Sequence, residues 1–183
     1  KALLLKGRLL LDDGDELADQ AGNLDAAAAA IKTYEDAREL FGLAQLHNPT
    51  DHTLVRQVHY LTALTYRKTA KMRPDEQGLF ADLEIALEQF GRTRRSHFDT
   101  AEGISASLEE AEIHQLLGDD DIAVAAFRRT LNFIADSPSY NNVWVPEDEM
   151  KSRIEAAYLT YREVGSLHRT TPPPSSLPPP LPP

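Results

Sequence analysis

The sequence predicts an all-α fold made of antiparallel helix pairs that stack side by side. Apolar residues recur at steps of three and four through most of residues 1–167, which is the spacing of one helix face. Several positions in residues 7–34 also match positions in residues 63–90 at a constant offset of 56 (63 − 7 = 56). No segment shows a convincing two-residue alternation, which a half-buried strand would require.

The clearest helix pair lies between Ala111 and Phe133, around a break formed by Gly118 and Asp119–Asp121. Apolar residues continue at helical spacing on both sides of this break. Glycine can take the left-handed conformation that ends a helix, and an aspartate behind it can cap the next one at its positive end. The aspartates lack the alternating ligands of a calcium loop, so we interpret them as a solvated capping turn.

The other helices follow from the same spacing and from the residues that interrupt it. Gly14 and Gly22 bracket a polar break after a leucine-rich opening helix, and Asn48-Pro49 ends the second helix. The alanine run in that second helix favours close packing against a neighbour. An irregular span with the only tryptophan, Trp144, precedes the last helix. The predicted helices outside the Gly118 pair span residues 1–13, 24–46, 53–70, 79–95 and 147–167.

Internal repetition groups these helices into three pairs. Gly7 corresponds to Ala63, and Ala30 corresponds to Ala86. In each second helix an aromatic residue follows an alanine by four positions, as Tyr34 follows Ala30. One pair cannot cover its own apolar face, so at least three are needed. The predicted units are residues 1–49, 51–98 and 103–138 with a closing helix at 147–167, which together make a helical domain over residues 1–168.

The third unit resembles the tetratricopeptide repeat (TPR), a helix-turn-helix unit of about 34 residues. Ala111 stands at the small position of the first helix, and Gly118 stands at the turn. Ala123 and Phe127 match the small and aromatic positions of the second helix, and Pro138 closes the unit. The resemblance implies a short right-handed solenoid. The first two units exceed the family length and lack its early aromatic residue.

In the family, the first helix of each pair lines a concave groove that binds a peptide or a segment of a partner protein. The resemblance therefore implies a protein-interaction scaffold or adaptor. The clamp that chaperone-binding members use for a terminal carboxylate is absent, because the matching positions hold Leu4, Arg8, Leu61, Ser105 and Glu109. The implied groove residues are Leu4, Arg8, Gln57, Tyr60, Leu61, Leu64, Arg67, Lys68, Leu108, Glu109, Glu112 and Gln115.

A second interpretation is a helical regulatory or dimerisation domain of a larger protein, in which the groove is filled within the chain. The burial of Leu61 and Leu64 separates this interpretation from a peptide binder. The chain begins at Lys1 without a methionine or a signal-peptide pattern, so we expect a processed or partial chain.

Composition and motifs favour a binding protein over an enzyme. The 29 acidic and 19 basic residues give a net charge of −10, which disfavours general nucleic-acid binding. No run of about 18 apolar residues occurs, so we expect no membrane-spanning helix. The sequence contains no phosphate loop, nucleophile elbow or metal-binding helix motif. We therefore predict no catalytic residues, no cofactor and no metal, and an enzyme with an unrecognised helical site is the remaining rival.

Two polar groups receive specific interpretations. His52 and His59 are seven residues apart with Arg56 between them, which does not suit a metal pair. The acidic run of the fifth helix is predicted to be an exposed helix face, and an acidic patch for a basic partner is the alternative. That run comprises Glu102, Glu109, Glu110 and Glu112.

The chain ends in a proline-rich tail, residues 169–183, that is expected to be disordered or extended polyproline II. Its segment Pro179, Pro180, Leu181 and Pro182 resembles ligands of WW and SH3 domains. A stiff linker is an equally good interpretation. A third possibility is that the tail folds back on a surface that carries Trp144, Tyr158 or Tyr161.

Overall fold

The computed structural model describes residues 1–20, 24–135 and 141–169, with side chains described as far as Leu159. Within these residues the chain forms seven α-helices and no strand, which confirms the all-α class. The helices are α1 (Ala2–Asp19), α2 (Leu24–His47), α3 (His52–Met72), α4 (Glu76–Ser96), α5 (Ala101–Leu117), α6 (Asp120–Ala135) and α7 (Glu147–Arg169).

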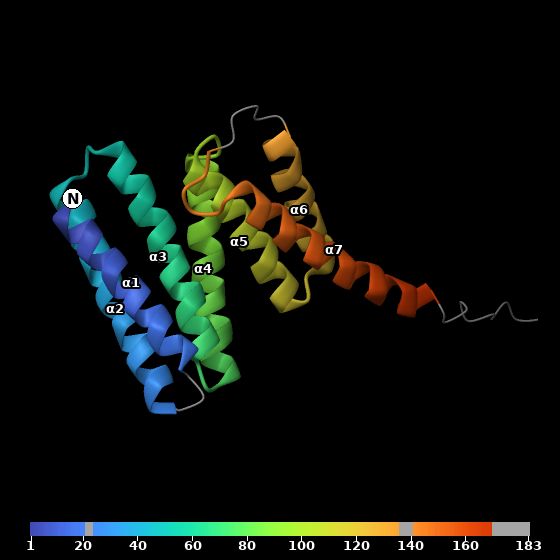
Figure 1. The fold of residues 1–183 in the computed structure, drawn as a ribbon, viewed down its shortest axis with the longest axis horizontal. Coiled ribbons are helices and arrows are strands. Elements are labelled where there is room, and N and C mark those ends of the chain that lie inside the picture. Colours follow the sequence, from blue (N-terminus) through green and yellow to red (C-terminus); the bar gives the residue numbers. More distant parts are fainter. Residues whose placement is uncertain (21–23, 136–140, 170–183) are drawn as a thin grey trace, which may run out of the picture.

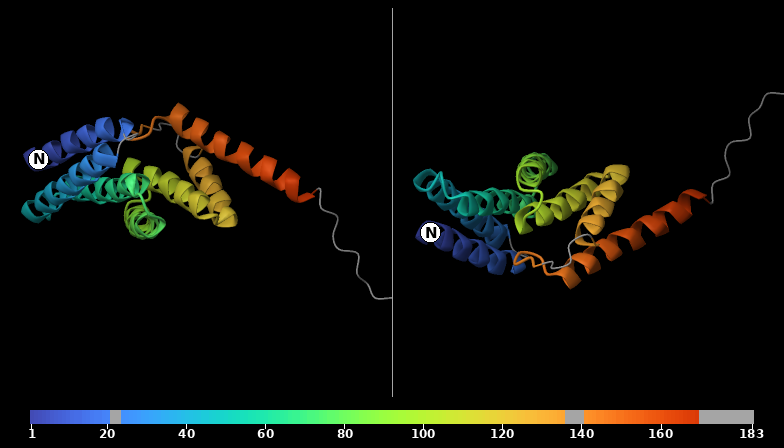
Figure 2. Two further views of the ribbon diagram at one scale, coloured as in Figure 1. Left: turned by 90° about the horizontal axis from the view of Figure 1, so that it is seen from below. Right: turned by 90° about the horizontal axis from the view of Figure 1, so that it is seen from above.

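Consecutive helices form the pairs α1/α2, α3/α4 and α5/α6, which follow one another across the molecule (Figure 1). Each of these helices packs mainly against its neighbours in the sequence, and the first helices of the pairs also touch in order, α1 with α3 and α3 with α5. The last helix, α7, crosses the third pair on the side where α1 lies, and its C-terminal half extends beyond the other helices (Figure 2).

Side-chain caps explain where several helices begin. The Asp51 carboxylate accepts a hydrogen bond from the Leu54 amide at 3.0 Å and caps α3. Asp75 accepts one from the Gly78 amide at 2.7 Å, so α4 begins at Glu76, three residues before the predicted start. At the α5/α6 turn, Gly118 has φ +80°, which confirms the predicted left-handed position.

The first helix is longer than predicted, because Gly14 does not interrupt it. A Cβ built on Gly14 would lie 2.5 Å from a ring carbon of Tyr34, and one built on Gly7 would lie 2.5 Å from a ring carbon of Phe41. The two glycines therefore let aromatic rings of α2 rest directly on the backbone of α1. The prediction of a polar break from residue 14 was wrong because these glycines serve close packing and not chain reversal.

The repeated alanine and aromatic positions lie in the core. Tyr34, Phe90 and Phe127 are all at most 1 % exposed, and the alanines that precede them by four residues are fully buried. Two groups of buried residues meet at α5, one formed with α1 to α4 and the other with α6, Val145 and α7. Helix α5 therefore contributes residues to both groups, and it joins α6 and α7 to the first two pairs.

None of the described helices combines the length and the apolar character required of a membrane span. The predictions made for Gly22, Pro138 and the tail segment Pro179–Pro182 fall outside the described residues.

Candidate functional site

The glutamates of α5 are buried and paired with arginines. Glu102 accepts a hydrogen bond from Arg56 Nε of α3 at 2.9 Å, and Glu110 is paired with Arg94 of α4. Glu102 and Glu110 are 3 % and 7 % exposed. The prediction of an exposed acidic face on this helix was wrong, as was the acidic patch, because neighbouring helices cover α5 from residue 102 to residue 111.

The densest group of charges joins three helices. Arg67 of α3 forms ion pairs with both Glu109 and Glu112 of α5. Arg153 of α7 donates to the same two carboxylates, from Nη2 to Glu109 Oε1 at 2.9 Å and from Nε to Glu112 Oε1 at 2.7 Å. We call these four residues the ion cluster. It balances two positive charges against two negative ones, which is the condition under which buried charges are tolerated.

The pKa shifts in the ion cluster have clear causes. Burial alone would raise the pKa of Glu112, but the hydrogen bonds and charges of Arg153 and Arg67 outweigh it, so this pKa lies below its usual value. Burial lowers the pKa of Arg67, and Glu112 offsets only part of that effect. Burial also acts on Arg153, but there the hydrogen bond and charge of Glu112 prevail and the pKa is raised.

A bent segment, residues 142–146, lies between α1 and the start of α7 and contacts α3 and α5 (Figure 2). Asn142 fastens this segment to α5. Its side-chain amide donates to the Ala101 carbonyl at 3.2 Å and to Ser105 Oγ at 2.8 Å. Its side-chain oxygen accepts from the Trp144 amide at 2.8 Å and from the Val145 amide at 3.2 Å.

Trp144 is the apolar anchor of this segment. Its ring lies 5.2 Å from the ring of Tyr60 on α3, between centroids, and the Arg8 guanidinium of α1 lies 5.2 Å from the Trp144 ring centroid. Tyr60 is thereby enclosed, and burial raises its pKa to about 12. The indole Nε1 of Trp144 is buried and has no hydrogen-bond partner within the described residues.

Beside the ion cluster the same side of the molecule contains three hollows that share Lys71 as a lining residue. One, of about 350 Å³, reaches from Lys71 past the ion cluster to Trp144. The others, each of about 370 Å³, reach toward Asp15 of α1 and toward Ala157 of α7. We call these hollows, together with the surface of α3 and α5 that residues 142–146 contact, the trough.

The trough contains one paired and one unpaired lysine. Lys68 Nζ lies 2.7 and 2.8 Å from the two carboxylate oxygens of Asp15, which also accepts a hydrogen bond from Tyr34 Oη at 2.8 Å. Lys71 has no ion-pair partner among the described residues. Burial and the nearby charge of Arg67 lower the pKa of Lys71. An acceptor that reaches this end of the trough would therefore find a free ammonium group.

Many of the predicted groove residues lie close together in the structure, but about half of them are buried. Gln57, Leu64, Lys68, Glu112 and Gln115 are partly buried, and Arg8 is exposed beside Trp144. The buried residues are Leu4, Tyr60, Leu61, Arg67, Leu108 and Glu109.

Asn142 and Arg153 were not predicted as site residues, and Trp144 was predicted only as part of an irregular span and as a platform on which the tail could fold. Paired charges, one free ammonium group and an aromatic anchor can hold a polypeptide segment. No group of three or more histidine, cysteine or acidic residues that could hold a metal occurs in the described parts of the chain.

The fold and the site define an all-α protein of helix pairs whose inner trough is partly occupied by the chain itself. No protein-family model, curated protein or solved structure matches this chain.

Proposed function

We propose that this chain is a protein-interaction module, a short TPR-like array of helix pairs whose trough binds an extended segment of a partner protein. The three pairs would stack as a right-handed solenoid, with α1, α3 and α5 as the helices that line the groove. The pairwise order of contacts supports this arrangement, because in a solenoid each unit touches mainly its neighbours.

The observation that carries the proposal is the packing of residues 142–146 against α3 and α5. This bent segment is held by Asn142, which donates hydrogen bonds to Ala101 and Ser105 of α5, and by Trp144, whose ring packs against Tyr60. A surface that accepts such a segment from its own chain has the hydrogen-bonding groups and the aromatic platform to accept one from another chain.

The trough is also prepared for binding before a ligand arrives. The ion cluster fixes the side chains of Arg67 and Glu112 between three helices, so little side-chain entropy remains to be lost on binding. The free ammonium of Lys71 supplies a point charge for a carboxylate or a carbonyl group of the partner. The buried indole N–H of Trp144 has no acceptor among the described residues, which disfavours the self-occupied state and supports displacement by a better-matched segment.

Selected peptides provide the test. Peptides that bind the protein would be isolated from a random displayed library, and their Kd values would be measured by fluorescence anisotropy. Lys71→Gln is expected to weaken peptides with an acidic residue by about 1 kcal/mol, or about fivefold in Kd. Lys32→Gln is the control for the charge change, because this lysine pairs with Asp36 on its own helix and does not line any of the three hollows. A library that yields no binder, or binders equally affected by both substitutions, would contradict the proposal.

The alternative function is a closed helical domain with no free peptide ligand, which regulates or dimerises a larger protein. The burial of Leu61, 1 % exposed, and the seat of Trp144 favour it. In that case peptide selection fails, and light scattering after size exclusion reports either a dimer or a monomer that is indifferent to ligands. Leu64 is only partly buried, which favours the open trough.

A further inference from the structure

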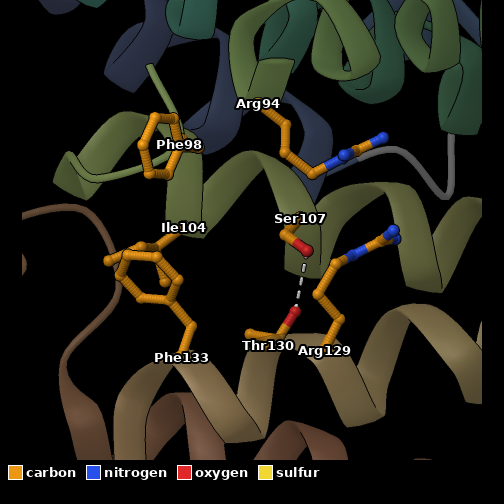
Figure 3. A pocket seen from close by; sticks show the side chains of 8 residues that line it. Arg94, Phe98, Ile104, Ser107, Arg129, Thr130 and Phe133 are labelled. Atoms are coloured by element: carbon orange, nitrogen blue, oxygen red, sulfur yellow. Dashed lines mark hydrogen bonds between the residues drawn. The ribbon is translucent and has the colours of Figure 1, made fainter. Parts of the chain in front are cut away.

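A separate pocket lies between the end of α4, the start of α5 and α6 (Figure 3). Its volume is about 180 Å³. Ile104 and Ser107 contribute from α5, and Ser107 precedes Glu112 of the ion cluster by five residues, or about 140° around the helix. The pocket and the trough therefore lie on different sides of α5.

The walls of the pocket are apolar, and the polar groups in its floor are satisfied. The rings of Phe98 and Phe133 flank Ile104 in Figure 3. On the floor, Thr130 Oγ1 lies 2.9 Å from Ser107 Oγ and donates to the Ala126 carbonyl at 3.0 Å. An occupant of the inner part would thus be apolar. An apolar cavity of about 150 Å³ holds a benzene ring, so this pocket has room for one aromatic or branched side chain.

Two arginines stand at one side of the pocket. In Figure 3 the side chains of Arg94 and Arg129 lie beside Ser107 and Thr130 and extend the same way, away from the phenylalanines. Arg94 is paired with Glu110. Arg129 has no ion-pair partner in the part of the chain that the structure describes. Burial and the nearby positive charge of Arg94 lower the pKa of Arg129, so an anion at this place would relieve an unfavourable charge.

The surroundings extend this positive character. The C-terminal part of α4 carries Arg92, Arg94 and Arg95, and α6 carries Arg128 and Arg129. Only Glu88 and Glu110 form ion pairs with these five arginines within the described residues. Residues 92–95 and 128–129 are therefore locally basic segments on a chain whose net charge is −10, and Arg94 and Arg129 are the members that line the pocket.

We propose that this pocket is a second protein-binding site, which takes one large apolar side chain of an acidic segment of a partner protein and pairs a neighbouring carboxylate with Arg129. The volume supports a single side chain and not a larger ligand. The two arginines at one side of the pocket, Arg94 and Arg129, support an acidic partner chain, because guanidinium groups hold carboxylates with two parallel hydrogen bonds. The site stands apart from the trough and does not depend on the function proposed for it.

Titration with short peptides tests the proposal. The ¹H–¹⁵N correlation spectrum of the protein would be followed during addition of N-acetyl-Asp-Phe-Asp-amide, and the neutral N-acetyl-Asn-Phe-Asn-amide would be the matched probe. We expect shifts at Ile104, Ser107 and Thr130 with the acidic peptide. We also expect a Kd at least about fivefold weaker with the neutral one.

Two arginine variants distinguish a specific contact with Arg129 from a general effect of positive charge. Arg129→Gln is expected to weaken the acidic peptide about fivefold, whereas Arg128→Gln, the same charge change one residue away and outside the pocket lining, is expected to leave it within about twofold. Phe98→Ala removes an exposed wall of the pocket and is expected to weaken both peptides.

Three results would overturn the proposal. The first is the absence of shifts at the pocket residues, and the second is equal binding of the acidic and neutral peptides. The third is tighter binding of a thymidine octanucleotide at the same signals, which would assign the basic segments to single-stranded nucleic acid.

Discussion

Arg153 of α7 grips the carboxylate of Glu112 on α5 with two parallel hydrogen bonds. The Nε–Oε1 and Nη2–Oε2 distances are both 2.7 Å. Such two-pronged pairs fix orientation as well as distance. This contact ties the closing helix to the central helix and brings residues 142–146 into the trough, because they directly precede α7.

Loss of this contact is predicted to destabilise the protein. Arg153→Ala leaves the two glutamates of the ion cluster with Arg67 alone, so one negative charge loses its partner in a largely buried place. We expect a loss of about 2–3 kcal/mol, below the usual cost of breaking a fully buried pair because Arg153 is partly exposed. Urea denaturation measures it. Arg92→Ala, which breaks an exposed pair with Glu88, is the control and is expected to change the free energy of unfolding by about 0.5 kcal/mol or less.

Because Gly14 packs against Tyr34, glycine-to-alanine changes at Gly14 and at Gly42 are predicted to have opposite effects on stability. Gly14→Ala places a methyl group 2.5 Å from a ring that is buried and held by Asp15, so we expect a loss of about 1–3 kcal/mol despite better helix propensity. Gly42→Ala meets nothing within 4 Å and is expected to stabilise the protein by about 0.5–1 kcal/mol. Thermal unfolding of both variants measures the difference, and equal signs would refute this role of Gly14.

The aromatic ring of the third pair is predicted to be essential to its core. Phe127 is fully buried and its ring lies 6.5 Å from that of Tyr158 on α7, between centroids. Phe127→Ala is expected to cost about 3–5 kcal/mol, the range for a buried aromatic residue. Denaturant unfolding would report this loss, whereas an unchanged midpoint would place the ring outside the core.

Stability is predicted to fall as the solution becomes mildly acidic. Burial and the proximity of His97 lower the pKa of His59, and burial and the charge of Arg56 lower that of His97. Below about pH 6.5 the unfolded chain therefore binds more protons at these sites than the folded one, and the free energy of unfolding decreases with falling pH. Denaturation at pH 7.5 and pH 6.0 measures the slope. The double variant His59→Gln, His97→Gln is expected to flatten it, and an unchanged slope would show that other groups are responsible.

The sequence contained enough information for the helix class and for the core of each pair. Tyr34 and Phe90 recur four residues after a buried alanine, and tertiary packing preserves that local pattern. The exception was Gly14, because its contact with Tyr34 joins two helices and leaves no local signal.

The charges of α3 and α5 carried a signal that a search for like charges on one face of each helix could have found. Arg56 and Arg67 are eleven residues apart (67 − 56 = 11), or about three helical turns, so they share one face of α3. Glu102 and Glu109 are seven residues apart (109 − 102 = 7), or about two turns. Two arginines on one face and two glutamates on another predict a paired interface. The position of Trp144, in contrast, depends on a segment with no periodicity.

The binding account is tested most directly by supplying the segment that occupies the trough as a separate peptide. The double variant Asn142→Ala, Trp144→Ala removes the anchor and the fastening of residues 142–146, and circular dichroism verifies that the helices remain. A fluorescent synthetic peptide with the sequence of residues 141–150 is then titrated against this variant and against the unmodified chain. The account predicts saturable binding to the variant and clearly weaker binding to the unmodified chain, whose trough is filled. Equal affinity for both proteins, or no binding to the folded variant, would contradict it.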